Sequence, residues 1–538
     1  MSATLAAPRM RLGALFQGRR APASDAWTEF LAAVEPALAH APRLHRFALP
    51  PVLWEPDREP VPLAVWIEGD GEATERSRAA LAGGTRAPTA VLGGTLRAAL
   101  ADTRSDWLLL VRDGDEPAPL ALERLGQAAA EADDVDLITC DADEVSADGA
   151  RHSPRVRPGP SPDRWLSCDD SGPLLVVRRE RAAAVANELA NSTAWRHELA
   201  LMLAGPAGER HAHVPLLLCH TPTARRPGPP LEPEHVERVL RGWEPGAKVE
   251  PGETARVVRR PVSGEPSVEV IMCFRDGPSL LARSVASLIV RTDYERLSVT
   301  LVDNGSEQAE TAELINGLSH HPRITVRRDD RPFNFAALNN GAARNSSADF
   351  LVFLNNDTEV TDPSWITTLL EEAARPEVGA VAPMLTYPDG AVQHVGAALG
   401  LHGYAGHPFA GLSPSTHTPF GRADGGTRNW LAVTAACTMV ERAKFEAVGG
   451  FDESFVVGGN DVDLCLRLTG AGHRSLCVPR AIVVHDESRT RGSHVDPGDF
   501  AASERSYGLF RTVGDPFYNP NLSLTATDCS MRRPGGAP

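Results

Sequence analysis

Residues 349–369, DFLVFLNNDTEVTDPSWITTL, carry the pattern on which the fold prediction rests. An apolar run ends in the polar triplet NND, and apolar residues then recur at helical spacing from Trp365. The first pattern predicts a buried strand, and the second predicts a helix. In open α/β sheets, ligands bind beyond the carboxyl ends of the strands, which is where this triplet lies.

The same alternation continues upstream of this stretch. Predicted strands at 268–273, 297–303 and 324–328 alternate with predicted helices at 279–290, 310–319 and 335–345. Strands and helices that alternate at this spacing predict an α/β fold, Rossmann-like, with a mostly parallel sheet covered on both faces.

An internal repeat extends this prediction to the first half of the chain. Residues 106–125, DWLLLVRDGDEPAPLALERL, match the segment from Asp349 at an offset of 243. WRHELALML from Trp195 matches NDVDLCLRL from Asn460 at an offset of 265, which also pairs His220 with His485. Two tandem copies of one fold are the economical interpretation.

Composition shifts divide the chain further. We expect an Ala/Pro-rich N-terminal extension at 1–55, a first α/β domain at 56–225, a Pro-rich linker at 226–262 with a short helix near 234–241, a second α/β domain at 263–500 and a mobile C-terminal tail at 501–538.

The 538 residues include 54 basic and 70 acidic side chains, a net charge of −16. A nucleic-acid binder carries a basic surface, so that class is excluded. Eight cysteines without a C-x-x-C pair indicate reduced thiols in the cytoplasm, with neither a disulfide framework nor a zinc site. No apolar run reaches the roughly 18–20 residues that span a bilayer. The basic N-terminal stretch could touch the inner membrane surface as a peripheral contact, or it could be an unstructured terminus.

Three polar residues follow predicted strands of the second half, namely Asp303, Asp357 and His485. Carboxyl ends of parallel strands share one edge, so the three are expected there together. Carboxylate oxygen and imidazole nitrogen suit a divalent cation whose remaining positions accept a phosphate. For Asp303, a structural role in the turn Asp303-Asn304-Gly305 is the alternative.

A second group lies in GGNDVDLCLRL, where Asn460 is expected to cap a helix and Asp463 to complete a capping-box-like pair. This leaves Asp461 free at the positive end of the helix, where its carboxylate stays ionised, as a general base requires. Trp430 could stack on a sugar face or belong to the core.

Seven motifs occur in order: VEVIMCFRDG, LSVTLVDNGS, FNFAALNNGAARNSSADFLVFLNNDTEV, PDGAVQHVGAALG, AVTAACTMVERAKFEAVGGFDESF, NDVDLCLRL and HDES. With these motifs the chain resembles family 2 glycosyltransferases of the GT-A fold over residues 100–495. More narrowly, it resembles the tandem-domain type of bacterial surface-polysaccharide gene clusters. The NND triplet is similar to that of rhamnosyltransferase-like members.

The resemblance implies an inverting transferase that takes a nucleotide-sugar donor and a glycan or lipid-linked acceptor; a homodimer is left open. Asp461 matches the family's catalytic aspartate, and Asp357 and His485 match its ligands for Mg²⁺ or Mn²⁺. The implied donor-binding residues are Phe274, Arg275, Asp303, Asn304, Asn339, Asn356 and Asp357, and the implied acceptor-binding residues are Trp430 and Asn460. Arg489 and Arg491 could fold over the diphosphate or be solvated.

The chain departs from the family pattern in two places of the second half. The first strand ends Cys273-Phe274-Arg275-Asp276 where relatives have Pro-Thr and a polar pair, and the triplet before Thr358 has one carboxylate where many relatives have two.

The first half is expected to be degenerate and non-catalytic. At the two offsets, Arg112 and Gly114 stand at the positions of Asn355 and Asp357, and Arg196 stands at that of Asp461. A shift of one residue would supply Asp113 or Asp115 as a ligand, but no carboxylate replaces the base.

Two other functions remain as alternatives. A glycan-binding scaffold without catalysis would explain the single-carboxylate triplet. A nucleotidyltransferase is disfavoured, because only Arg275-Asp276-Gly277 follows the first strand of the second half, where a Gly-rich phosphate loop with a basic residue would be needed.

Overall fold

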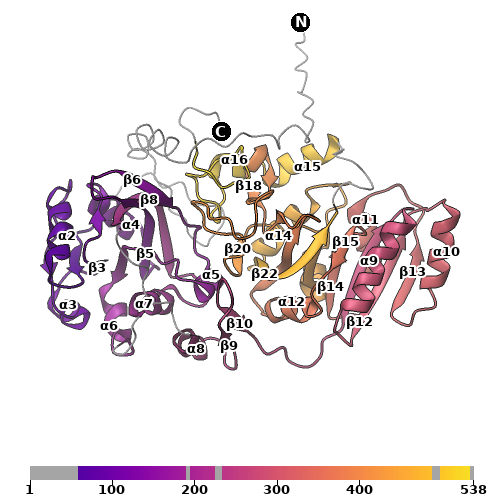
Figure 1. The fold of residues 1–538 in the computed structure, drawn as a ribbon, viewed down its shortest axis with the longest axis horizontal. Coiled ribbons are helices and arrows are strands. Elements are labelled where there is room, and N and C mark those ends of the chain that lie inside the picture. The colour runs from indigo at the N-terminus through magenta and orange to yellow at the C-terminus, as the bar shows by residue number, and fades with distance from the viewer. Residues whose placement is uncertain (1–58, 190–193, 224–232, 487–496, 533–538) are drawn as a thin grey trace, which may run out of the picture.

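The computed structural model describes residues 59–189, 194–223, 233–486 and 497–532. It contains two α/β domains, the first indigo to magenta and the second pink to yellow (Figure 1). The expected N-terminal extension, together with Arg489 and Arg491, lies outside the described residues.

The second domain is built on a mixed sheet with the order β13-β12-β11-β14-β21-β16-β22-β15. Its strands are β11 (Val268–Phe274), β12 (Leu297–Asp303), β13 (Ile324–Arg328), β14 (Phe350–Leu354), β15 (Thr358–Val360), β16 (Val378–Thr386), β21 (Cys437–Glu441) and β22 (Arg474–His485). Strands β13, β12, β11 and β14 are parallel, as predicted, whereas β21 runs antiparallel to both β14 and β16. The sheet is therefore less parallel than the strand–helix alternation predicts.

The first domain repeats seven of these eight positions, in the order β2-β1-β3-β7-β5-β8-β4, and among its described residues no strand corresponds to β13. Its strands are β1 (Ala64–Ile67), β2 (Val91–Leu92), β3 (Trp107–Val111), β4 (Glu116–Pro117), β5 (Leu137–Val145), β6 (Arg151–Arg155), β7 (Leu175–Arg178) and β8 (His211–Pro222). Every pairing along this path has the same sense as in the second domain. The predicted pair of tandem α/β domains is confirmed.

The strand pairing corrects the alignment of the two halves at one place. Glu116 pairs with His220 as Thr358 pairs with His485, so the offset here is 242 rather than 243. The loop after β3 is one residue longer than the loop after β14. Asp115, and not Gly114, is therefore the counterpart of Asp357.

Helices cover both faces of the second sheet (Figure 1). Helices α9 (Pro278–Arg291) and α12 (Trp365–Ala373) pack on one face, and α11 (Phe335–Ala343) and α14 (Asn460–Gly470) pack on the other. Helices α10 (Ala309–Leu318) and α13 (Arg442–Ala447) also belong to this domain. The first domain contains α2 (Glu72–Ala82), α3 (Leu96–Asp102), α4 (Ala121–Glu131), α5 (Pro162–Ser167), α6 (Arg179–Val185) and α7 (Trp195–Ala204).

The expected linker contains ordered structure. Helix α8 (Pro233–Arg241) is the short helix that the sequence predicts, and a hairpin of β9 (Lys248–Glu250) and β10 (Val257–Arg259) follows it. Val236 and Leu240 are fully buried in the core of the first domain. The helix thus packs against that domain because its apolar face completes the domain's core.

The expected C-terminal tail also differs from the prediction. Helices α15 (Pro497–Tyr507) and α16 (Phe510–Val513) form there, and Phe517, Leu522 and Cys529 are buried in the core of the second domain. The side chain of Asn519 also reaches the first domain, where it donates to Asp141 at 2.7 Å. Residues 497–532 are held by core burial and by hydrogen bonds. The sequence predicts a mobile tail because apolar periodicity is lost there, but neither kind of contact requires such periodicity.

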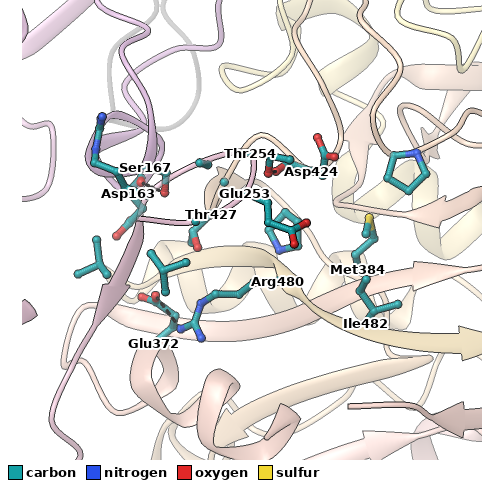
Figure 2. A pocket seen from close by; sticks show the side chains of 18 of the residues that line it. Asp163, Ser167, Glu253, Thr254, Glu372, Met384, Asp424, Thr427, Arg480 and Ile482 are labelled. Atoms are coloured by element: carbon teal, nitrogen blue, oxygen red, sulfur yellow. Dashed lines mark hydrogen bonds and ion pairs between the residues drawn. The ribbon is translucent and has the colours of Figure 1, made fainter. Parts of the chain in front are cut away.

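The junction between the domains holds a cavity of about 310 Å³. Figure 2 shows Asp163 and Ser167 of α5, Glu253 and Thr254 of the linker, and Ile482 of β22 around it. None of the residues predicted for the active site lines this cavity.

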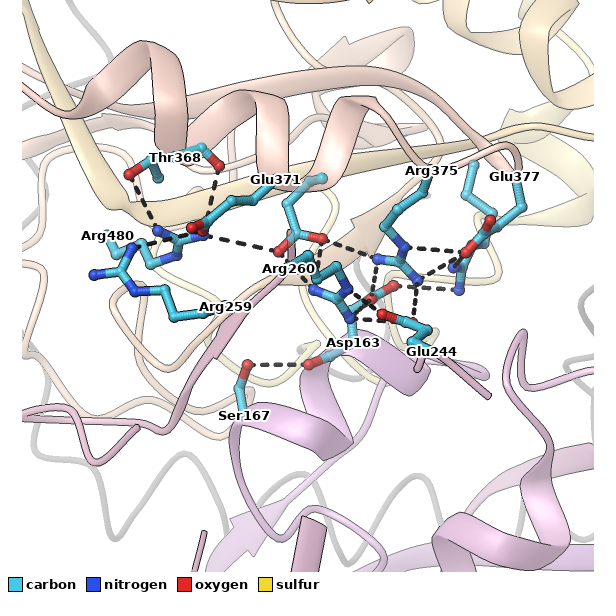
Figure 3. A network of polar contacts seen from close by, with 12 residues as sticks. Asp163, Ser167, Glu244, Arg259, Arg260, Thr368, Glu371, Arg375, Glu377 and Arg480 are labelled. Atoms are coloured by element: carbon cyan, nitrogen blue, oxygen red, sulfur yellow. Dashed lines mark hydrogen bonds and ion pairs between the residues drawn. The ribbon is translucent and has the colours of Figure 1, made fainter. Parts of the chain in front are cut away.

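Beside the cavity, a buried network of charges joins the domains (Figure 3). The carboxylate of Asp163 lies 2.5 Å from Arg375 and 3.2 Å from Arg474, both of the second domain. Arg260 of the linker lies 3.6 Å from Asp163 and 2.9 Å from Glu372. Burial raises the pKa of Asp163, but the guanidinium groups around it outweigh burial and hold that pKa well below its usual range.

Candidate active site

Asp357 and His485 meet at the edge of the second sheet. Oδ1 of Asp357 lies 3.0 Å from Nε2 of His485, and the two residues are only 7% and 5% exposed. Strand β15 pairs antiparallel with the end of β22, which sets Thr358 opposite His485. The sequence predicts that Asp357 and His485 share one edge of the sheet, and the β15–β22 pairing brings them into direct contact.

Two further polar residues adjoin this pair from β17 (Val392–His394). Oε1 of Gln393 lies 2.6 Å from Nδ1 of His485, and Nε2 of Gln393 donates to the backbone oxygen of His485 at 3.3 Å. Nδ1 of His394 lies 2.9 Å from Nδ1 of His407. Burial, with smaller contributions from His407 and His485, lowers the pKa of His394 well below its usual range, so its ring is neutral at pH 7.

Gln393 and His394 lie within the motif PDGAVQHVGAALG, but the sequence predicts no role for either residue. The available signal was their position, since two adjacent polar side chains interrupt an apolar run. Two adjacent polar residues in an apolar run are also typical of a turn, so this pattern alone does not predict a functional site.

Asp461 occupies the second position of α14. One carboxylate oxygen accepts the backbone N–H of Ala435 at 3.1 Å, and the other accepts that of Val462 at 2.9 Å. A helix N-terminus favours negative charge, and the side chain is only partly buried. The carboxylate of Asp461 therefore lies at a helix N-terminus and is accessible to a reactant.

The segment 434–436 connects this acid to the pair at the sheet edge. The backbone N–H of Asn355, two residues before Asp357, donates to the carbonyl of Ala436 at 3.0 Å. The adjacent Ala435 donates to Asp461. Asp461 and Asn355 therefore bond to adjacent residues of one short stretch of backbone, and Asn355 lies two residues before Asp357.

Helix α15 holds the loop that precedes α14. The carboxylate of Asp499, which is 1% exposed, accepts the backbone N–H groups of Val456, Val457 and Gly458 at 2.6, 2.9 and 2.9 Å. Charge-assisted bonds of this kind are among the stronger hydrogen bonds in proteins. Asp499 has no role in the sequence prediction, although it lies within the expected second domain, because it is 38 residues beyond Asp461 and outside the motifs that carry the family resemblance.

Asp303 and Asn304 form hydrogen bonds with their own turn and with residues 328–331. The carboxylate of Asp303 accepts the backbone N–H of Ser306 at 2.8 Å and pairs with Arg328 at 2.8 Å. The side-chain amide of Asn304 donates to the carbonyls of Asp329 and Arg331, both at 2.8 Å. These contacts fit the structural alternative for Asp303 and leave its contact with a nucleoside as a proposal.

The other predicted donor-binding residues are divided between interior and surface. Phe274 is buried in the sheet core, and the amide of Asn339 donates to the carbonyl of Phe335 on its own helix at 2.8 Å. Asn356 is buried beside Asp357. Arg275 is exposed and pairs with Glu307 at 3.4 Å.

The two residues expected to contact the acceptor are buried. Trp430 of β20 (Arg428–Trp430) is 1% exposed and packs edge-on against Phe420, so its ring belongs to the core and the sugar-stacking role is withdrawn. Asn460 is 2% exposed and begins α14 instead of capping it, because Gly459 takes the capping position with φ of 90°. Asp463 forms no capping box and instead pairs with Arg467.

Asp357 and His485 supply one oxygen and one nitrogen of the types that a divalent cation accepts. Within the described ranges, no group of three or more His, Cys, Asp or Glu side chains could hold a metal ion. The pair therefore fits a cation whose other coordination positions are filled by substrate oxygens or water.

Among the residues that the structure describes, no helix is long and apolar enough to cross a membrane.

Comparison with known proteins gives the family. Residues 269–447 match the model described as "Glycosyl transferase family 2". The O-antigen biosynthesis protein RfbC of Myxococcus xanthus is 39% identical over 82% of this chain and 36% of its own length. An uncharacterized protein of Sinorhizobium fredii is 38% identical over 51% of this chain and 31% of its own length, so the chain spans about a third of each of these relatives.

A third relative is matched over most of its own length. The N-acetylglucosaminyl-diphospho-decaprenol L-rhamnosyltransferase of Mycobacterium tuberculosis is 30% identical over 45% of this chain and 82% of its own length. Among solved structures, GalNAc-T7 with UDP, GalNAc and Mn²⁺ is 19% identical and superposes with a TM-score of 0.35 over 42% of this chain and 45% of its own. On the sequence matches, the chain belongs to glycosyl transferase family 2.

Proposed function

We propose that this chain is an inverting glycosyltransferase with one active site, in the second domain. It transfers a sugar from a nucleoside diphosphate donor to an acceptor hydroxyl. The observation that carries the proposal is that Asp461 and Asn355 bond to the adjacent residues Ala435 and Ala436, while Asp357, two residues after Asn355, contacts His485 at 3.0 Å.

Asp461 acts as the general base. Its carboxylate takes the proton of the acceptor hydroxyl as the hydroxyl oxygen attacks the anomeric carbon. The bond from that carbon to the diphosphate breaks on the opposite side, and its electron pair leaves with the diphosphate. Single displacement inverts the anomeric centre. Asp499 holds the loop before α14 and thereby fixes the position of the base.

Asp357 and His485 are the residues that would hold Mg²⁺ or Mn²⁺. When bound, such a cation supplies positive charge that stabilises the departing diphosphate. Both side chains are nearly excluded from water, which strengthens their interaction with charge. The backbone around Asp303 and Asn304, close to the end of β11, is the proposed nucleoside contact, since Asn304 N–H donates to the carbonyl of Phe274 at 2.8 Å.

The names of the relatives narrow the proposed substrates. One is named for O-antigen biosynthesis and another for L-rhamnosyl transfer to a sugar carried on a lipid diphosphate. We therefore propose a hexose or deoxyhexose donor and a lipid-linked or glycan acceptor in surface-polysaccharide synthesis. The eight free cysteines support a reducing, cytoplasmic site of action.

The test measures donor binding and transfer separately. A panel of nucleotide sugars is screened by thermal shift with Mn²⁺, since a ligand that binds only the folded state raises the melting temperature. The donor that binds is then used in a transfer assay with polyprenyl-diphosphate-linked sugars. We expect turnover that Asp357→Ala abolishes. Binding of polysaccharide fragments without turnover of any nucleotide sugar would instead support a glycan-binding scaffold.

A further inference from the structure

Gln393 makes two contacts with His485, one through each end of its amide. Its Nε2 donates to the backbone oxygen of His485 at 3.3 Å, and its Oε1 lies 2.6 Å from Nδ1 of the ring. A backbone oxygen only accepts, so the NH₂ end of the amide must face it. This orientation leaves the amide oxygen facing the ring.

The ring tautomer follows from this orientation. Because the amide oxygen only accepts, Nδ1 of His485 must carry a proton. A neutral imidazole carries one N–H, so Nε2 presents a lone pair. That lone pair faces Oδ1 of Asp357 at 3.0 Å. Two acceptor atoms at this distance repel unless a proton or a metal cation lies between them.

We infer that Gln393 is a positioning residue that holds His485 in its Nδ1–H tautomer, so that His485 Nε2 and Asp357 Oδ1 together face a divalent cation. The inference rests on the proposed function, which makes these two residues the metal ligands. Gln393, on β17, would then determine which ring nitrogen of His485 can bind the cation. Hydrogen bonds from the second nitrogen of a ligating histidine commonly have this effect.

The first domain offers an internal comparison for this role. His220, the counterpart of His485, also has its Nδ1 held, here by Oδ1 of Asp143 at 2.6 Å. A carboxylate there does what the amide of Gln393 does in the second domain. The Gln393→Glu variant should therefore keep the tautomer, whereas the Gln393→Met variant, of similar length and without an acceptor of comparable strength, should lose it.

The first experiment reads the tautomer without metal or substrate. The full-length protein is labelled with ¹⁵N-histidine at pH 8, and the His485 signals are assigned by their loss in a His485→Asn variant. We expect a proton on Nδ1 and none on Nε2 in the wild type and in Gln393→Glu, and a shift to Nε2–H in Gln393→Met. A proton on Nε2 of the wild-type ring overturns the inference, as does an unchanged tautomer in Gln393→Met.

The second experiment titrates each protein with Mn²⁺ alone and counts bound ion by electron paramagnetic resonance. We expect affinity to fall about 10–100-fold in Gln393→Met. It should be unchanged in the exposed control Gln308→Met and largely kept in Gln393→Glu. If Asp357→Ala abolishes Mn²⁺ binding and Gln393→Met does not weaken it, the proposed metal site stands and the inference fails. If the wild type binds no Mn²⁺, the metal site fails, and the tautomer measurement still decides the role of Gln393.

Discussion

The two domains share one sheet plan but carry opposite charges at the start of one matching helix. Helices α7 and α14 occupy matching places, and each presents a charged second residue, Arg196 in the first domain and Asp461 in the second. The guanidinium of Arg196 donates to the carbonyls of Leu110 and Pro173, at 3.3 and 2.6 Å. The carboxylate of Asp461 instead accepts a backbone N–H from the corresponding loop before β21.

The second difference concerns the histidine at the end of the last long strand. In the first domain, His220 bonds to Asp143, and that carboxylate also accepts from Arg151 at 2.7 Å. In the second domain, Nε2 of His485 faces Asp357 at 3.0 Å, and among the described residues no arginine forms an ion pair with this carboxylate. The comparison teaches that the sheet sets where side chains lie, while a few residues at its edge decide the chemistry.

The largest effect should come from removing the proposed general base, Asp461. We expect Asp461→Asn to lower kcat by about 10²–10⁴-fold, because general-base catalysis contributes on that scale. Donor binding should persist, and this is measured by thermal shift. In contrast, Arg196→Gln should leave the turnover per folded molecule unchanged. If Asp461→Asn and Arg196→Gln lowered kcat equally, the proposal that only the second domain contains an active site would be contradicted.

The next effect concerns the junction that holds the two domains together. Asp163→Asn leaves Arg375 and Arg474 without their buried partner, and losing one member of such a network costs about 3–5 kcal/mol of stability. Denaturation by urea measures this loss, with the exposed Asp133→Asn as the control. Because the folded pKa of Asp163 is lowered, its contribution is present above its unfolded pKa and is lost as pH falls through the folded value. A wild type without this acid-side loss, or a variant as stable as the control, would contradict the assignment.

A smaller effect is expected at the support of the acid-bearing helix. Asp499→Ala removes the acceptor of three N–H groups, and the resulting displacement of Asp461 should lower kcat about 10–100-fold. The KM for the donor should change little, because Asp357 and His485 are untouched. Steady-state kinetics separate the two constants. A rise in KM at constant kcat would instead place Asp499 in donor binding.

The smallest effect should come from Asp515, which lies where the C-terminal segment packs. Burial raises its pKa to about 7, although it accepts N–H groups of Leu399 and Phe517. A raised folded pKa means that stability is greatest below the unfolded pKa and is lost as pH rises through 7. We expect the stability of Asp515→Asn to fall less than that of the wild type as pH rises through 7. The melting temperatures of the two proteins should then differ by about 2–4 °C at pH 8. An identical pH profile in both proteins would contradict the raised pKa.

Strand periodicity and strand ends predicted the second sheet and the edge at which Asp357 and His485 meet. These features depend on local patterns and on the shared direction of parallel strands. The contact between the two residues depends on β15 pairing with β22, which no local pattern encodes. Burial of Trp430 and the role of Gln393 likewise arise from packing between distant segments.

The one-residue difference in the loop after β3 has the same origin. A repeat aligned by apolar matches keeps a single offset, whereas strand pairing fixes which residue faces the histidine. Sequence comparison of the halves therefore chose Gly114 where the pairing gives Asp115.

The contact between Asn519 and Asp141 spans 378 positions of the chain. A ribosome that adds about 5–20 residues per second needs roughly 20–75 s to cover that distance. During this interval the first domain exists without the segment that closes over it. Final docking of the two domains is thus a late event of translation, and the nascent chain depends on α8 and the linker hairpin to keep the first core covered until then.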